Sequence, residues 1–268
     1  GVVTVSGYDV VSHSLDVRRH IGYLPETVPL YLDMTVTDYL KYMGEIRGMN
    51  SSWVKERLPL VIGMVKLGEY RDTLVGRLSK GYRQRTGIAQ AILHEPDVLI
   101  MDEPTIGIDP IQVVETRQLI SDLGREHTLL LSSHILPEVS AICSRVLVIN
   151  DGRIVADDDP DQLSDKLQHA ERIEVSVRGV DAPAFISAMR EISVVIDART
   201  DQRVSIVQRA ERENFSPFIV DARPNNNASE LVAKTVIDNG WGLSNLTPLP
   251  MTLEEIFLEL TTEENLGE

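Results

Sequence analysis

The chain has 268 residues, a formal net charge of -15 and a single cysteine, Cys143. Its length suits two domains or one large one, and a lone cysteine excludes an internal disulfide framework. The acidic balance disfavours non-specific binding to nucleic acid or anionic lipid, and no apolar run approaches the roughly 18 to 20 residues that span a bilayer.

The first half of the chain alternates apolar runs with helical patterns. It begins with Gly1 in a segment typical of a strand already under way, from which we expect an upstream segment to be missing. A helical insertion is expected over about residues 35–94, and residues 111–123 predict a further helix. Three continuous apolar runs are typical of strands buried on both faces of a parallel sheet: 98–101, 128–131 and 146–149. This order predicts an α/β fold, with a tight hairpin at Asp151-Gly152.

The second half has a different pattern. Residues 157–165 are acidic and rich in turn formers, and we place a boundary near residue 168, which gives domains 1–168 and 169–268. The second domain is expected to contain strands at 173–177, 194–196, 204–207 and 218–220, helices at 182–192 and 228–239, and a final strand and helix ending at Leu260. These elements predict a small α+β domain without a catalytic motif, for which a ferredoxin-like arrangement is a candidate.

Two acidic residues, Asp102 and Glu103, stand at the end of a predicted buried strand. Ligands of open α/β sheets bind at the carboxyl ends of strands. Hydrolysis of a phosphoanhydride needs a divalent cation and a group that orients or deprotonates water. In this interpretation Asp102 holds Mg²⁺ through water and Glu103 is the general base; the alternative is two acids that cap a strand end by chance. His134 ends the next strand, which favours contact with a γ-phosphate or with water over a structural role.

Polar residues at two predicted helix starts allow two interpretations. Ser79 precedes a helix that runs to His94, and Asp109 precedes the helix at 111–123. Each is therefore a candidate N-cap. A helix start with a nearby glycine, Gly81, also suits a phosphate, because free amides point outward and the helix dipole favours an anion. Without further context the capping role is favoured for both residues.

Taken in order, these segments resemble the nucleotide-binding subunit of ABC transporters. Residues 78–85, Leu-Ser-Lys-Gly-Tyr-Arg-Gln-Arg, are similar to the family signature, and residues 98–103 to its Walker B strand with the catalytic glutamate. Residues 106–109 are similar to its D-loop and His134 to its switch histidine. The resemblance implies a P-loop-NTPase-like parallel-sheet core with a helical subdomain, and ATP and Mg²⁺ as ligands.

The resemblance also implies roles and partners. It implies a homodimer packed head to tail, in which Ser79, Lys80 and Gly81 act on the nucleotide held by the other subunit, with Asp109 in the D-loop. Glu26 occupies the place of the Q-loop glutamine and keeps an oxygen donor near Mg²⁺. The partners implied are a second ATP-binding subunit and transmembrane permease subunits, with no nucleic acid, at the cytoplasmic face of a bacterial-type membrane.

The chain departs from the family pattern at several points. Lys80 and Tyr82 replace a glycine and a glutamine of the signature, and together with Pro25-Glu26 and the second domain they are similar to subunits of drug, antibiotic or gliding-type exporters. The phosphate-binding pattern G-x-x-x-x-G-K-[ST] is not present in the 268 residues. The resemblance places it upstream of Val3, so we do not expect the chain as it stands to turn over ATP.

The function implied is the ATP-hydrolysing subunit of an ABC exporter. Two alternatives stay open: a soluble ABC-type ATPase that acts on ribosomes or DNA, and a non-catalytic regulatory or interaction protein built from a degenerate ATPase.

Overall fold

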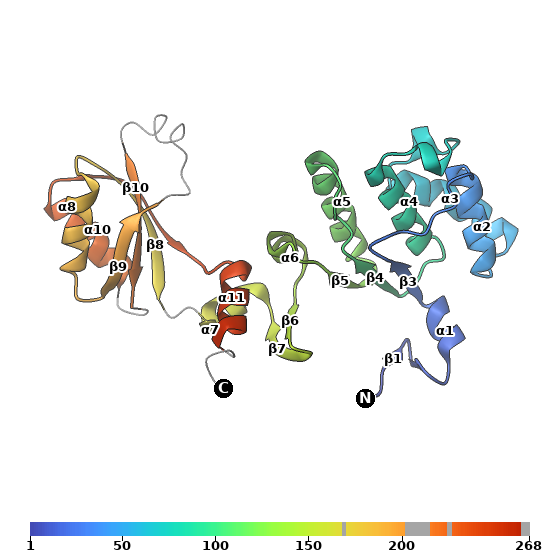
Figure 1. Cartoon of the computed structure of the whole chain (residues 1–268), viewed down its shortest axis with the longest axis horizontal. Coiled ribbons are helices and arrows are strands. Elements are labelled where there is room, and N and C mark those ends of the chain that lie inside the picture. The colour runs from blue at the N-terminus through green and yellow to red at the C-terminus, as the bar shows by residue number, and fades with distance from the viewer. Residues whose placement is uncertain (168–169, 202–214, 224–226, 264–268) are drawn as a thin grey trace. The chain divides into compact units, whose positions relative to one another are not determined.

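The computed structural model describes residues 1–167, 170–201, 215–223 and 227–263 (Figure 1). The chain forms two compact units that divide between Ile142 and Cys143. The predicted boundary between residues 168 and 169 falls outside the described residues and stays a prediction. Within the described ranges, no helix is both long enough and apolar enough to cross a membrane.

The first unit contains a parallel sheet and a group of helices. Strand β4 pairs with β3 on one side and with β5 on the other, in both cases parallel. The elements in chain order are β1 (Thr4–Val5), β2 (Tyr8–Asp9), α1 (Ser14–Arg19), β3 (Ile21–Leu24), α2 (Val36–Ile46), α3 (Ser51–Met64), the 3-10 turns η1 (Gly68–Tyr70) and η2 (Val75–Arg77), α4 (Lys80–Ile92), β4 (Val98–Asp102), α5 (Pro110–Leu123), β5 (Thr128–Ser132) and α6 (Leu136–Ile142). The predicted α/β fold with a parallel sheet is confirmed.

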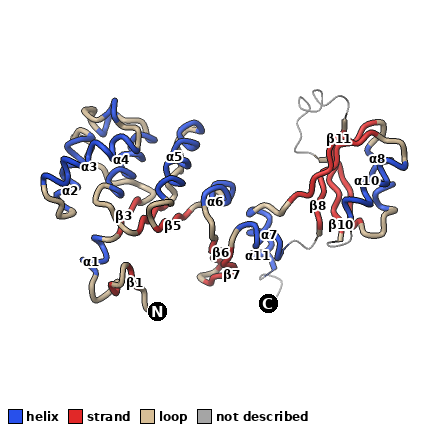
Figure 2. Tube along the Cα trace, turned by 180° about the vertical axis from the view of Figure 1, so that it is seen from behind, coloured by secondary structure: helices blue, strands red, loops and turns tan. Residues whose placement is uncertain are grey.

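The helical insertion begins at a capped residue, as its sequence dictates. Thr35 accepts a hydrogen bond from the Asp38 amide at 3.1 Å, and its own hydroxyl donates to the Asp38 carboxylate at 2.8 Å. This cap satisfies the Asp38 amide in the first turn of α2. Asn50 caps α3 in a similar way by accepting from the Trp53 amide. Figure 2 shows helices α2, α3 and α4 gathered together, and their apolar side chains join those of β3 and β4 in one buried core.

A glycine in β3 lets the helical region approach the sheet closely. A Cβ atom added to Gly22 would lie 2.2 Å from the carbonyl oxygen of Ala91 in α4 and 2.6 Å from a methyl group of Leu99 in β4. Since both neighbours belong to packed elements, only glycine fits at this position.

Two expectations about the apolar runs are wrong. The run at 146–149 forms β6, which pairs antiparallel with β7 instead of joining the parallel sheet. The hairpin turn after β6, with Asp151 and Gly152 at positive φ, brings a local partner strand back at once. In β5, alternate side chains are exposed: Leu130 is 56% accessible. A continuous apolar run does not show whether its partner strand is parallel or antiparallel, and it does not show whether both faces of the strand are buried.

The second unit is built on a four-stranded antiparallel sheet with the strand order β11-β8-β10-β9. Its elements are β6 (Val146–Asn150), β7 (Arg153–Asp158), α7 (Pro160–Leu167), β8 (Glu171–Arg178), α8 (Ala182–Arg190), β9 (Val195–Thr200), β10 (Ser216–Ala222), α10 (Ala228–Asp238), β11 (Gly242–Leu249) and α11 (Leu253–Glu263). Among the described elements from β8 to β11 the order is βαββαβ, the ferredoxin-like arrangement that the sequence offered as a candidate. The strand predicted at 204–207 lies outside the described residues.

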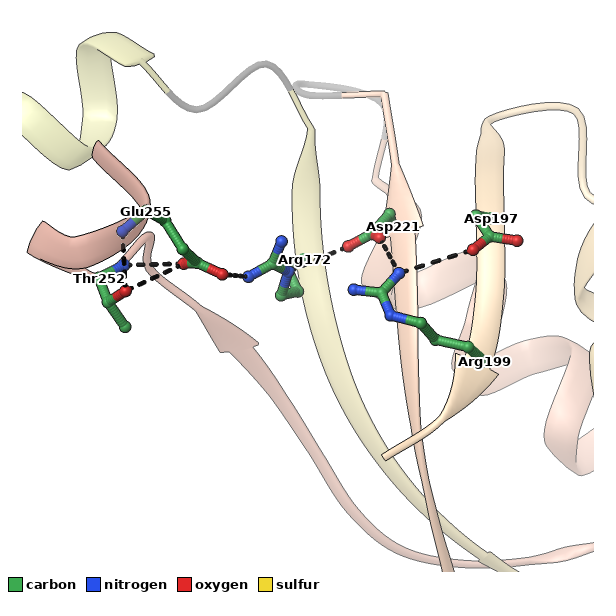
Figure 3. A network of polar contacts seen from close by, with 6 residues as sticks. All are labelled: Arg172, Asp197, Arg199, Asp221, Thr252 and Glu255. Atoms are coloured by element: carbon green, nitrogen blue, oxygen red, sulfur yellow. Dashed lines mark hydrogen bonds and ion pairs between the residues drawn. The ribbon is translucent and has the colours of Figure 1, made fainter. Parts of the chain in front are cut away.

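Helices α8 and α10 lie on the same face of this sheet in both views (Figures 1 and 2). Phe185 of α8 stacks on Phe218 of β10 with ring centroids 4.0 Å apart, in a core of buried apolar side chains. A chain of charged groups runs across strands β8, β10 and β9 (Figure 3). Arg172 links Asp221 to Glu255 of α11, and therefore ties that helix to the sheet.

Candidate functional site at the carboxyl ends of the parallel strands

The parallel sheet brings the ends of its strands to one edge. The register pairs Leu24 with Met101 and Asp102 with Ser132, so the segments that follow β3, β4 and β5 all leave the sheet at the same edge. In an open α/β sheet this edge is where ligands bind. The segments concerned carry Glu26, Glu103 and His134, three of the residues predicted from the sequence.

Glu103 is held by its neighbours in an unusual backbone conformation. Its φ angle is 46°, in the left-handed region that residues other than glycine rarely adopt. The Glu103 amide donates to the Ser132 carbonyl oxygen at 3.1 Å and lies 3.3 Å from the Ser132 hydroxyl. Backbone of this kind costs about 1 to 3 kcal/mol and persists only where surrounding contacts define it. The end of β5 therefore sets the direction in which Glu103 points.

Glu103 and His134 are in direct contact. The Nδ1 atom of His134 lies 2.8 Å from Oε1 of Glu103. The second carboxylate oxygen, Oε2, is buried and has no hydrogen-bond partner among the described residues. Buried polar atoms in native proteins are almost always paired, with protein or with water. His134 therefore anchors the carboxylate through Oε1, while Oε2 is enclosed without a bond to the described residues.

His134 reaches this position from the loop between β5 and α6. The Ser133 hydroxyl accepts from the Ile135 amide at 3.0 Å and turns the chain toward α6. The imidazole itself stays 64% exposed, whereas the Glu103 side chain is 16% exposed. One ring nitrogen is engaged by Glu103, which leaves the other side of the ring available to a ligand in solution.

Asp102 ends β4 and accepts a hydrogen bond from the Ser132 hydroxyl. In the part of the chain that the structure describes, no group of three or more His, Cys, Asp or Glu residues could enclose a metal ion. Mg²⁺ at nucleotide sites does not need such a group, because it keeps water and phosphate oxygens and takes one or two carboxylates. Asp102, partly exposed beside a hydroxyl, fits this lighter requirement.

The signature segment, residues 78–85, lies beside the loop that follows Glu103. A Cβ atom at Gly107 would lie 2.3 Å from Nζ of Lys80, and one at Gly81 would lie 1.4 Å from Oε1 of Gln112 in the first turn of α5. Gly107 also has a φ of 67°, which a side chain would strain. The start of α4 thus packs closely on the loop and on the start of α5.

The two predicted N-caps are present. Ser79 accepts from the Tyr82 amide at 3.4 Å, and Asp109 accepts from the Gln112 amide at 3.1 Å. The capping interpretation of both residues is therefore confirmed, and any role toward nucleotide comes in addition to it. The contacts described for Ser79, Lys80 and Gly81 do not include Glu103 or His134.

A charge pair further along α4 fixes the two helices to each other. Arg85, 5% exposed, pairs with Glu115 of α5, and Lys66 lies 3.2 Å from the same carboxylate. The hydrogen bond from Arg85, followed by that from Lys66, lowers the pKa of Glu115. The pair therefore keeps Glu115 ionised and links α4 to α5.

Glu26 is the predicted site residue that the structure connects least. It is exposed in the segment after β3, and its carboxylate makes no ion pair or hydrogen bond within the described ranges. Conversely, sequence reasoning missed Ser132, which contacts both Asp102 and the Glu103 amide. A polar residue in the last position of an apolar strand, directly before Ser133-His134, was the available signal.

Comparison with known proteins places this site in a family. A model described as "ABC transporter" matches residues 1–106. Nod factor export ATP-binding protein I of Rhizobium sp. (strain N33) is 30% identical over 269 residues, which cover 98% of this chain and 80% of that protein. The chain belongs to the family of ABC transporter ATP-binding proteins.

Two further relatives agree with this membership. The ABC transporter ATP-binding protein NatA of Bacillus subtilis (strain 168) is 39% identical over 158 residues, which cover 58% of this chain and 64% of NatA. The chain therefore spans less than two thirds of the length of NatA. A solved structure titled "Structure of ATP binding subunit of ABC transporter" matches with a TM-score of 0.54 and 27% identity, over 61% of this chain and 68% of that one.

Proposed function

We propose that this protein is the ATP-hydrolysing subunit of an ABC transporter, and that it works as one of two subunits packed head to tail. The observation that carries the proposal is the 2.8 Å contact between His134 and Glu103 at the carboxyl ends of adjacent parallel strands. Family membership supports it, because both relatives are named as ATP-binding proteins.

In this mechanism Glu103 is the general base. Its Oε1 is held by His134, which fixes the carboxylate that would accept the proton of the attacking water. Asp102, with Ser132 beside it, would hold Mg²⁺, whose charge stabilises the phosphate oxygens. Glu26 would add a second carboxylate from the end of β3. His134 would orient the water or contact the γ-phosphate with the side of its ring that faces solvent.

The signature segment would act on the nucleotide of the second subunit. Ser79 and Lys80 are exposed at the start of α4, where a helix N-terminus and a lysine ammonium both favour phosphate. Gly81 lets the backbone pack against Gln112, and Asp109 fixes the start of α5 after the D-loop. Because the contacts described for these groups do not include Glu103 or His134, a second copy would complete each site.

The partners would be transmembrane permease subunits, reached from the cytoplasmic face of the membrane. The relative from Rhizobium is named for Nod factor export, which supports an exporter of the drug, antibiotic or gliding type for this protein too. The acidic net charge of -15 offers no general attraction to nucleic acid.

The test is MgATP binding and hydrolysis by the protein encoded by the whole reading frame. Binding is measured by calorimetry and turnover by phosphate release. Glu103→Gln keeps the size and the hydrogen bond of the side chain but removes the base, so we expect turnover to fall by about 100-fold or more while MgATP still binds. His134→Ala should lower turnover far more than binding.

A matched control is His127→Ala, since His127 is a half-buried histidine whose Nδ1 contacts the Pro96 carbonyl oxygen at the opposite end of β5. Undiminished turnover in Glu103→Gln would remove Glu103 as the base. A complete protein that binds no nucleotide would replace the proposal with a non-catalytic interaction role.

A further inference from the structure

A second contact joins the segments that carry Glu103 and His134. The hydroxyl of Thr105 donates to Oε2 of Glu138 at 2.5 Å. Both residues are buried, Thr105 with 3% and Glu138 with 7% of the surface exposed. They are 33 residues apart in sequence, and neither has a part in the mechanism above.

Thr105 and Glu138 are each close in sequence to a proposed catalytic residue, and a backbone hydrogen bond closes the turn in each segment. Thr105 is two residues after Glu103, inside a turn closed by the bond from the Ile106 amide to the Glu103 carbonyl oxygen at 3.1 Å. Glu138 is four residues after His134, in the first turn of α6, where its amide donates to the Ile135 carbonyl oxygen at 2.9 Å. A shift of Thr105 relative to Glu138 would therefore be passed on to both ends of the Glu103–His134 contact.

The pair is costly to bury, which argues against an incidental contact. A carboxylate taken out of water is destabilising unless its oxygens are hydrogen-bonded. A helix surface could carry an apolar residue at this point at no such cost. What the hydroxyl and carboxylate supply instead is direction, because a hydrogen bond fixes distance and angle where an apolar contact does not.

Glu103 also needs external restraint. Its backbone is in the left-handed region, and its amide is already tied to Ser132. The bonds from Glu103 to Ser132, from Glu103 to His134 and from Thr105 to Glu138 connect the same two segments at three successive points. The bond between Thr105 and Glu138 therefore adds a third restraint to the two at Glu103 itself.

We propose that Thr105 and Glu138 form a positioning pair that holds the Glu103 carboxylate against His134. The inference rests on the proposed function for its catalytic consequence, but its geometric content can be tested separately. Neither residue touches the reacting atoms in this account; both act through the two that do.

The test compares Thr105→Val, which keeps the shape and removes the hydroxyl, with Thr105→Ser and Glu138→Gln, which keep a donor and an acceptor for the bond. Thr116→Val is the matched control, since Thr116 is a buried threonine of α5 with 1% of its surface exposed. In the 268-residue chain, long-range ¹H–¹⁵N spectra of the imidazoles report the His134 tautomer, which its Nδ1 contact with Glu103 biases.

We expect Thr105→Val to move the His134 imidazole signals, and the Ser, Gln and control variants to leave them in place. In the protein encoded by the whole reading frame, Thr105→Val should lower kcat by about 10-fold or more with KM for MgATP changed less than about 2-fold, because a misplacement near 1 Å can cost about 100-fold. Unmoved His134 signals in Thr105→Val would overturn the inference, as would an equal shift in Thr116→Val. A wild-type protein without ATPase activity would refute the proposed function, and the imidazole spectra would still decide the positioning role.

Discussion

His94 gives the stability of the first unit a defined dependence on pH. The residue is 7% exposed, its Nε2 lies 3.1 Å from the Ile21 carbonyl oxygen, and its Nδ1 is buried without a partner among the described residues. Burial, followed by the positive charge of Arg47, lowers the pKa of His94 from 6.5 to about 4. Arg47 is itself fixed, because it donates to the same Ile21 carbonyl oxygen at 3.2 Å.

Because the pKa of His94 is lowered on folding, the free energy of unfolding falls as the pH falls. Below pH 6.5 the unfolded chain takes up a proton on His94 that the folded chain refuses until the pH approaches 4. The stability that the folded chain has with His94 neutral is therefore fully present above pH 6.5, and it is lost as the pH falls from 6.5 toward 4. Between pH 8 and pH 5 the free energy of unfolding should drop by about 2 kcal/mol on account of this one residue, at about 1.4 kcal/mol for each pH unit within the window.

The assay is urea unfolding of the chain at pH 8, 6 and 5. Of its two tryptophans, Trp53 packs against the core of the first unit and Trp241 against that of the second. A Trp241→Phe background therefore makes fluorescence report the first unit alone. In this background His94→Gln, which keeps an N–H donor for Ile21 but does not titrate, should remove about 2 kcal/mol of the pH dependence.

His13→Gln, at an exposed histidine, controls for the loss of an imidazole and should leave the dependence unchanged. If wild type and His94→Gln lose the same stability between pH 8 and pH 5, the reasoning from burial and from Arg47 is refuted.

Two further predictions concern glycines. Gly22→Ala should destabilise the first unit by about 1 to 3 kcal/mol, since its Cβ would overlap the Ala91 carbonyl oxygen. Gly63→Ala, where a Cβ would meet open space in α3, should cause no loss in the same urea titration. Gly81→Ala should cost less than Gly22→Ala in the same titration, since the atom its Cβ would meet, Oε1 of Gln112, ends a flexible side chain that can turn away. A loss as large as that of Gly22→Ala would contradict the packing described here.

The secondary structure could be predicted where the pattern is local. The helix caps at Ser79 and Asp109 and the hairpin at Asp151-Gly152 all follow from residues close together in the chain. Caps and tight turns depend on backbone φ angles and on side-chain hydrogen bonds within two or three residues. The types of the neighbouring residues are therefore enough to predict them.

The partners of the strands could not be predicted in the same way. The run at 146–149 is as apolar as that at 98–101, yet only the latter joins the parallel sheet. The strand at 21–24 carries a glycine and a tyrosine, and its place beside β4 was not predicted. Pairing is decided by which segments the fold brings alongside, and a single sequence does not encode that choice in the composition of either strand.

The candidate site shows the same division. The sequence by itself determined that Asp102, Glu103 and His134 stand at strand ends, because motif order and spacing are properties of the chain. Only the tertiary structure decided that Ser132 holds the Glu103 amide, that Gln112 lies over Gly81, and that Thr105 meets Glu138 across 33 residues. These contacts join residues with no regular spacing, and their directions depend on the register of two strands and the packing of two helices, which form only when the chain has folded.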